Sequence, residues 1–153
     1  MELGYGPEDR KSGMQAATQI GLEAVLKDVQ ASIECARNQL GRKVGVLGFC
    51  WGGTVAWLAA TRLQPDAVVA YYGGQIAKHS DEKPRCLVQL HFGKLDVHIP
   101  MSEIEGIRQH HPEVPLFLYD AGHGFNCDQR ESYEPVSAAL ARQRTLQFLQ
   151  ENL

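Results

Sequence analysis

A cysteine stands between glycines in Gly48-Phe49-Cys50-Trp51-Gly52, where a short apolar run gives way to a helical pattern. A strand, a sharp turn and a helix in this order are typical of a nucleophile elbow, here with Cys in place of Ser. The elbow holds its nucleophile in strained backbone geometry, and a helix N-terminus favours the thiolate form. We therefore expect Cys50 to be a nucleophile and the backbone N–H of Trp51 to be an oxyanion donor.

The same letters also fit a glycine-rich turn that carries a passive, buried cysteine. Two further motifs favour chemistry, because Asp96 and His123 each follow an apolar run, within Gly93-Lys94-Leu95-Asp96 and Ala121-Gly122-His123-Gly124. The carboxyl ends of parallel strands share one sheet edge, so these side chains are expected to converge with Cys50. In that arrangement His123 would accept the thiol proton and later activate water, while Asp96 would fix the imidazole tautomer.

The elements that must position these residues alternate between helices and buried strands. Mainly apolar runs predict strands at 44–48, 67–71, 86–92 and 116–119. Apolar residues at helical spacing predict helices at 14–38, after 52, at 101–110 and from 135 onward. Buried strands joined by helical crossovers predict an α/β fold with a parallel sheet flanked by helices. Residues 1–13 are expected to be an irregular lead-in, and residues 14–153 a single domain.

Composition excludes several classes of function. The chain has 153 residues and a net charge of −3 without any basic block, so neither nucleic acid nor a membrane surface is expected as a partner. No signal peptide is visible, and the four cysteines show no disulfide-framework or zinc spacing, so a cytoplasmic protein with reduced thiols is expected. His91 and His98 bracket Asp96 and could be metal ligands or substrate contacts, but no carboxylate cluster surrounds them, and we expect no metal.

Together the motifs around Cys50, Asp96 and His123 resemble the dienelactone hydrolase family, as does the apolar helical pattern of residues 138–149. The resemblance covers roughly residues 15–150. It implies an α/β-hydrolase fold and hydrolysis of a carboxylic ester or enol-lactone through a thiol-ester intermediate, without a cofactor. The family's triad falls on Cys50, Asp96 and His123.

The chain also departs from this family. A family member is longer at its N-terminus, and the absent part supplies the first strands, a second oxyanion N–H, a glutamate that holds the resting thiol and an arginine that binds the substrate carboxylate. A second carboxylate-binding arginine would fall four residues after His123, where this sequence has Cys127, and Arg130 is out of register. Loss of one oxyanion donor costs on the order of 100- to 1,000-fold in rate.

Three readings of function follow. The first is an ester or lactone hydrolase of the dienelactone type with a small-molecule substrate, in which Tyr72 and Phe125 line the substrate pocket. The second is a catalytically weak remnant that binds a partner or associates with itself. The third is a general thioesterase or small-ester hydrolase on the same triad, which faster hydrolysis of neutral esters than of anionic lactones would favour. Without the first strands the edge at 44–48 is expected to be bare, and either a homodimer or residues 1–13 would have to cover it.

Overall fold

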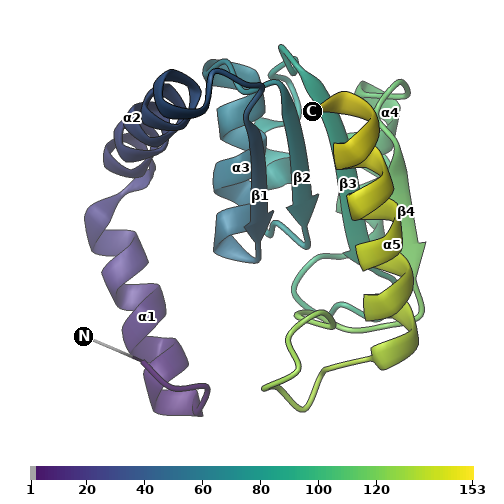
Figure 1. The fold of residues 1–153 in the computed structure, drawn as a ribbon. Coiled ribbons are helices and arrows are strands. Elements are labelled where there is room, and N and C mark those ends of the chain that lie inside the picture. Colours follow the sequence, from purple (N-terminus) through teal and green to yellow (C-terminus); the bar gives the residue numbers. More distant parts are fainter. Residues whose placement is uncertain (1–2) are drawn as a thin grey trace.

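The computed structural model describes residues 3–153 and contains one parallel sheet with helices around it (Figure 1). Its helices and strands follow one another as α1 (Pro7–Ile20), α2 (Leu22–Leu40), β1 (Gly45–Phe49), α3 (Trp51–Arg62), β2 (Ala67–Tyr71), the 3-10 helix η1 (Ile76–His79), β3 (Leu87–Gly93), α4 (Met101–His110), β4 (Leu116–Tyr119) and α5 (Pro135–Asn152). Within the described part of the chain, no helix is both long enough and apolar enough to span a bilayer.

The strands lie in their sequence order, β1-β2-β3-β4, and all neighbours are parallel. The predicted α/β class with a parallel sheet is therefore confirmed. The predicted strands at 67–71 and 116–119 have the observed bounds, and the other two shift by one residue toward the C-terminus. All four strands consequently end at one edge of the sheet, where the loops that carry the candidate residues begin.

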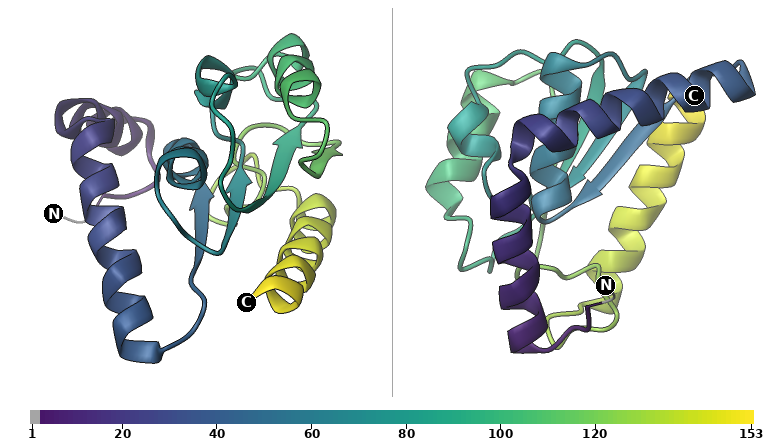
Figure 2. Two further views of the ribbon diagram at one scale, coloured as in Figure 1. Left: turned by 90° about the horizontal axis from the view of Figure 1, so that it is seen from above. Right: turned by 90° about the vertical axis from the view of Figure 1, so that its left-hand side faces the viewer.

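The two faces of the sheet carry different helices. A Cβ on Gly48 would meet Ala56 of α3, whereas a Cβ on Gly45 would meet Leu153 and Leu149 at the end of α5. Because side chains alternate along a strand, these contacts place α3 and α5 on opposite faces (Figure 2). The sheet is thus the middle layer between them.

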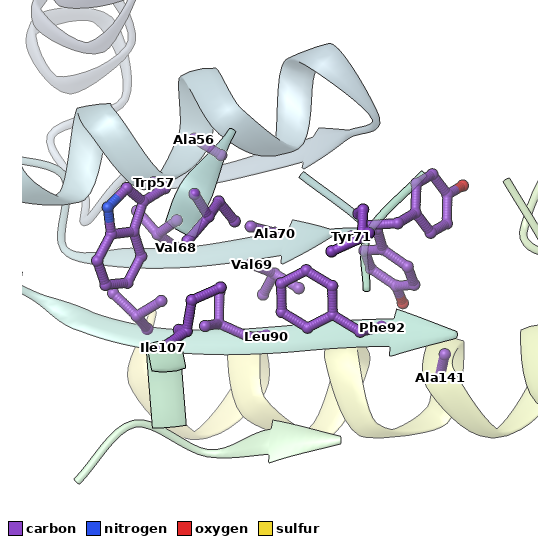
Figure 3. Packing of buried hydrophobic residues seen from close by; sticks show 14 of the residues in the cluster. Ala56, Trp57, Val68, Val69, Ala70, Tyr71, Leu90, Phe92, Ile107 and Ala141 are labelled. Carbon is purple, nitrogen blue, oxygen red and sulfur yellow. The ribbon is translucent and has the colours of Figure 1, made fainter. Parts of the chain in front are cut away.

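The core lies mainly between α3, the middle strands and α4. Its fully buried side chains interlock along β2 and β3, as Figure 3 shows for Trp57, Val68, Leu90, Phe92 and Ile107. Every residue of β2 is buried, which explains why this strand reads as an unbroken apolar run in the sequence. The rigid part of the molecule therefore surrounds β2 and β3, directly beneath the loops of the site.

A network of buried hydrogen bonds links α5 to the face of the sheet opposite α3. The hydroxyls of Tyr71 and Thr145 lie 2.6 Å apart, and the His91 ring lies within 3.3 Å of Thr145 Oγ1 and 2.7 Å of the Tyr119 hydroxyl. His91 is fully buried, and this burial lowers its pKa to about 3. The residue therefore stays neutral and belongs to the packing of α5 against the sheet.

The expectation of an irregular lead-in at residues 1–13 was wrong from residue 7 onward, and residues 1–2 lie outside the described part. Helix α1 begins at Pro7, and Glu8 and Asp9 occupy its first turn. Proline at the first helical position and acidic side chains beside the positive end of the helix dipole both favour a start there. The helix expected at 14–38 is divided at Gly21, whose φ of 75° and ψ of 154° cannot continue a helix.

Strand β1 has an unpaired outer edge within the described residues, as the sequence predicts. It pairs with β2 only, and helix α1 extends beside the sheet as an arm without buried residues (Figure 1). Leu47 and Phe49 are 46% and 40% exposed on β1. Residues 3–13 therefore do not cover the edge.

Candidate active site

The turn at Cys50 connects β1 to α3 and has an unusual backbone. Cys50 has φ 54° and ψ −119°, a left-handed conformation that L-residues avoid at a cost of about 1–3 kcal/mol. Its N–H donates to the Tyr71 carbonyl at 3.0 Å, and its own carbonyl accepts from the Gly53 N–H at 2.9 Å. Strand pairing and the first turn of the helix thus hold the strained residue from both sides, with the thiol at the sheet edge.

Glycine at position 48 makes this turn sterically feasible. A Cβ built on Gly48 would lie 1.9 Å from the Gly52 carbonyl oxygen and 2.9 Å from the Ala56 Cβ. No side chain fits there, because the start of α3 crosses directly over the end of β1. Glycine at position 48 is therefore needed for the close approach of strand and helix.

Asp96 follows the end of β3 and faces inward. Its side chain is fully buried, and Oδ1 accepts the backbone N–H of His98 at 2.8 Å. The other oxygen, Oδ2, lies 2.7 Å from Nδ1 of His123. A carboxylate held in this way can accept a hydrogen bond from the Nδ1–H group and so keep Nε2 of His123 turned toward the thiol.

His123 follows the end of β4 and lies between the other two residues. Its Nε2 is 3.1 Å from Cys50 Sγ, and its side chain is 16% exposed. The structure therefore brings together the three residues singled out from the sequence. A base within hydrogen-bond reach of a nucleophile, and oriented by a third group, is the arrangement that activates thiols for attack on carbonyl carbon.

The electrostatics of the site favour a charged pair. Burial raises the pKa of the Cys50 thiol, but the hydrogen bond and charge of His123, and then the Trp51 N–H, outweigh it and leave the pKa below its ordinary value. Burial acts against the His123 cation as well, yet bonds to Asp96 and Cys50 raise its pKa to about 9. The pKa of Asp96 is lowered in spite of burial, chiefly by its bond to His123. Both shifts favour a thiolate beside an imidazolium over the neutral pair.

The backbone N–H of Trp51 has the position expected of an oxyanion donor. Trp51 is the first residue of α3, where N–H groups have no partner inside the helix. This N–H donates toward the Cys50 sulfur and helps to lower the pKa of the thiol. The Trp51 N–H can therefore donate to a negative charge on the Cys50 sulfur or on a substrate oxygen next to it.

Tyr72 and Phe125 lie beside the triad, and both are buried. Tyr72 follows β2 with a φ of 37°, and its ring centroid is 5.2 Å from that of His123. Phe125 is fully buried, 5.3 Å from the Tyr72 ring, and packs behind it. Tyr72 is thus adjacent to the reacting groups, whereas Phe125 supports it from the core.

A further neighbour of the site is His98, which the sequence offers as a metal ligand or substrate contact but does not place against His123. His98 is exposed, and its ring stands edge-on at 5.3 Å from the His123 ring. Its position two residues after Asp96 is the only sequence signal that could have suggested this contact. Among residues 3–153, no group of three or more His, Cys, Asp or Glu side chains is placed to hold a metal ion.

Comparison with known proteins decides the family. The sequence profile of the "Dienelactone hydrolase family" matches residues 3–153. The chain is 34% identical over 170 residues to a Synechocystis protein named "Putative carboxymethylenebutenolidase", covering 99% of this chain and 69% of that protein. The chain belongs to the dienelactone hydrolase family.

Further relatives agree with this assignment. The carboxymethylenebutenolidase of Pseudomonas putida is 32% identical over 154 residues, which cover 94% of this chain and 65% of that protein. A crystal structure described as a "Putative Dienelactone Hydrolase" from Klebsiella pneumoniae superposes with a TM-score of 0.75 at 30% identity, over 84% of this chain and 61% of that one. The chain thus spans about two thirds of the length of these dienelactone hydrolase relatives.

Proposed function

We propose that this chain hydrolyses carboxylic esters or enol-lactones of the dienelactone type through Cys50, His123 and Asp96. The observation that carries the proposal is the continuous hydrogen-bonded line from Asp96 Oδ2 to His123 Nδ1 at 2.7 Å and from His123 Nε2 to Cys50 Sγ at 3.1 Å. Membership of the dienelactone hydrolase family supports the substrate class. The buried carboxylate and the strained thiol are arranged for nucleophilic attack rather than for packing alone.

Acylation begins with the thiolate–imidazolium pair. The Cys50 sulfur attacks the carbonyl carbon, a C–S bond forms, and the electron pair of the C=O bond moves to oxygen, where the Trp51 N–H donates to it. When this intermediate collapses, the bond to the leaving oxygen breaks and that oxygen takes the proton from His123 Nε2. The products of this half-reaction are an alcohol or enol and a thiol-ester on Cys50, with a neutral imidazole.

Deacylation restores the resting pair. Neutral His123 accepts a proton from water as the water oxygen attacks the thiol-ester carbon, and the second intermediate expels the Cys50 thiolate. Asp96 keeps the imidazole in the required tautomer in both halves and stabilises its charged form. The Trp51 N–H donates to the oxyanion in both halves.

The test is hydrolysis of 4-nitrophenyl acetate and of a dienelactone by the wild-type chain, Cys50→Ala and Cys35→Ala. Cys35 is exposed on α2 and makes a matched control for removal of a thiol. We expect Cys50→Ala to lose at least about 1,000-fold in kcat/KM and Cys35→Ala to match the wild type. Equal turnover by Cys50→Ala would reject the proposal, and folded wild-type protein without any turnover would favour the second candidate.

A second candidate function, self-association, is favoured by the open edge of β1. We propose that this edge pairs antiparallel with β1 of a second copy of the chain. Leu47 and Phe49 are 46% and 40% exposed there, and β1 contains no Lys or Pro of the kind that protects edge strands. A two-fold axis lets identical strands satisfy each other's free N–H and C=O groups.

Light scattering across a concentration series tests this pairing. The wild-type chain should form a dimer, and Leu47→Lys should shift it to monomer because a charge then lies in the apolar contact. Met14→Lys adds the same charge on α1, where Met14 is 73% exposed, and should leave the dimer intact. A wild-type monomer at all concentrations, or equal behaviour of the two variants, would reject the β1 dimer.

A further inference from the structure

Tyr72 stands beside the nucleophile at the end of the neighbouring strand. Phe49 of β1 is in register with Tyr71 of β2. The residues that follow them, Cys50 and Tyr72, therefore leave the sheet at the same level. The Cys50 N–H donates to the Tyr71 carbonyl at 3.0 Å. In the same way, the Tyr72 N–H donates to the His91 carbonyl at 2.8 Å, so the sheet fixes both turns.

Cys50 and Tyr72 also share a backbone conformation that side chains rarely adopt. They are the only residues other than glycine with positive φ among residues 3–153, at 54° and 37°. The left-handed region favours glycine, and strained residues of this kind gather at functional sites. Gly73 and Gly74 follow directly, yet the strained position holds a tyrosine. The turn itself gives no reason for a large side chain at position 72.

The Tyr72 ring lies against the catalytic base. Its centroid is 5.2 Å from that of His123 and 5.3 Å from that of Phe125, and the residue is buried. In the proposed acylation, the leaving oxygen has to approach Nε2 of His123, because it takes its proton from there. Tyr72 consequently lies beside the space that the leaving oxygen must occupy.

The Tyr72 hydroxyl has no side-chain hydrogen-bond partner among residues 3–153. By contrast, the hydroxyls of the buried Tyr71 and Tyr119 each have a side-chain partner at 2.6–2.7 Å. The group that meets the Tyr72 oxygen is the backbone N–H of Asn126, which is itself a donor. Burial, and then two nearby thiols, raise the pKa of Tyr72. The hydroxyl therefore stays protonated, and its proton is available to a bound molecule.

We propose that the Tyr72 hydroxyl donates a hydrogen bond to the leaving oxygen of the ester as the bond from this oxygen to carbon breaks; the inference rests on the proposed hydrolysis through Cys50. The proton that the leaving oxygen gains still comes from His123 Nε2, and Tyr72 keeps its own. The hydrogen bond stabilises the negative charge that builds up on the leaving oxygen. Tyr72 is thus a catalytic residue whose contribution grows with the basicity of the alcohol or enol that leaves.

The test compares two esters that carry the same acetyl group and differ in the leaving group. Phenyl acetate releases a basic phenolate, whereas 4-nitrophenyl acetate releases a weakly basic one. Tyr72→Phe removes the hydroxyl and keeps the ring. We expect kcat/KM to fall about tenfold for phenyl acetate, the effect of one hydrogen bond to a charged group, and by about twofold or less for 4-nitrophenyl acetate. Tyr133→Phe removes a hydroxyl from a residue that is 40% exposed and should leave both values unchanged.

Alkylation of Cys50 by iodoacetamide separates the proposed role from damage to the site. This reaction has no leaving oxygen, so its rate should be the same in Tyr72→Phe and in the wild type. Much slower alkylation in Tyr72→Phe would place the effect on the thiol and overturn the role of Tyr72 at the leaving group. Equal losses of kcat/KM for the two esters would overturn it as well, because damage to the fold slows both alike.

Mass spectrometry of the acetylated protein distinguishes failure of this inference from failure of the proposed function. An acetyl group on Cys50 of the wild type shows that the thiol attacks the ester, even when the thiol-ester is not turned over. If Tyr72→Phe then leaves the ratio of the two acetylation rates at its wild-type value, the inference alone is overturned. A wild-type Cys50 that is alkylated by iodoacetamide but acetylated by neither ester would overturn the proposed function and this inference together.

Discussion

Nε2 of His123 lies 3.1 Å from Sγ of Cys50, although 73 positions separate the two residues in the sequence. The contact joins the loop after β4 to the turn after β1, across the full width of the sheet. Burial disfavours charge on both groups, and the bond between them, the bond from His123 to Asp96 and the Trp51 N–H act against burial. The reactivity of Cys50 should accordingly respond to changes at either partner.

His123→Asn tests whether the imidazole sustains the thiolate. In the wild type, the rate of Cys50 alkylation by iodoacetamide should rise with pH to half its maximum below the ordinary pKa of a thiol. Without the imidazolium, burial dominates, and the midpoint should move upward by at least one pH unit, on the order of the usual effect of a close opposite charge. His110→Asn, on the exposed end of α4, should leave the midpoint in place; a common shift in both variants would contradict this interpretation.

The pH dependence of turnover should show that His123 acts as the general acid. His123 donates a proton to the leaving oxygen, and its pKa is raised to about 9 by Asp96 and Cys50 against the effect of burial. For an alkyl ester, kcat/KM should therefore rise as the thiolate forms and fall above about pH 9 as the imidazolium is lost. For a 4-nitrophenyl ester the fall should disappear, since its leaving group needs no proton. An equal fall for both esters would point to alkaline unfolding instead.

Asp96→Asn should keep the shape of the site and lose most of its rate. The amide preserves the volume but removes the charge that fixes the His123 tautomer, so we expect kcat to drop by about 100- to 10,000-fold. Asp120→Asn is the matched control, because Asp120 lies in the same group of loops but is 84% exposed and pairs with Lys94 on the surface. Steady-state kinetics measures kcat for both variants. Similar losses of kcat in Asp96→Asn and Asp120→Asn would contradict a role for Asp96.

Gly48→Ala should destabilise the protein, whereas Gly52→Ala should not. A methyl group at position 48 would lie 1.9 Å from the Gly52 carbonyl oxygen, while one at position 52 meets nothing within 4 Å. We expect a loss of at least about 3 kcal/mol in the free energy of unfolding for the first, and a change of about 1 kcal/mol or less, in either direction, for the second. Urea unfolding monitored by circular dichroism measures both; equal losses would show that strand and helix can separate at this turn.

The elements that frame the site could be predicted because their sequence patterns are local. Strand β2 is buried throughout and flanked by helices, so its apolar run has the same bounds as the strand, and helix α4 coincides with the predicted range 101–110. Asp96 and His123 stand directly after strands, and parallel topology alone brings such positions to one edge. The distances among Cys50, Asp96 and His123 then depend on the turns that carry them, and the glycines of these turns can be read from the sequence.

Other features have no local signature. The start of α1 at Pro7 and its break at Gly21 depend on capping and backbone geometry within a segment of weak periodicity. Arg130 folds back over Gly124 through two successive turns in an irregular loop, and spacing does not encode such turns. Burial of Phe125 behind Tyr72 follows from how the aromatic rings stack beneath the loop, and so becomes visible only in three dimensions.

Helix α1 buries none of its 14 residues, and its Met14 and Ile20 side chains are 73% and 55% exposed. Isolated helices of about this length are marginal in water, so the amide protons of α1 are protected only by its own helix–coil equilibrium. Strand β2 is paired on both sides within the sheet. Its amide protons therefore exchange only when the core opens. Amide exchange should thus be fast in α1, which unfolds and refolds on its own. It should be slow in the sheet and its core, which open as one unit beneath the reacting thiol.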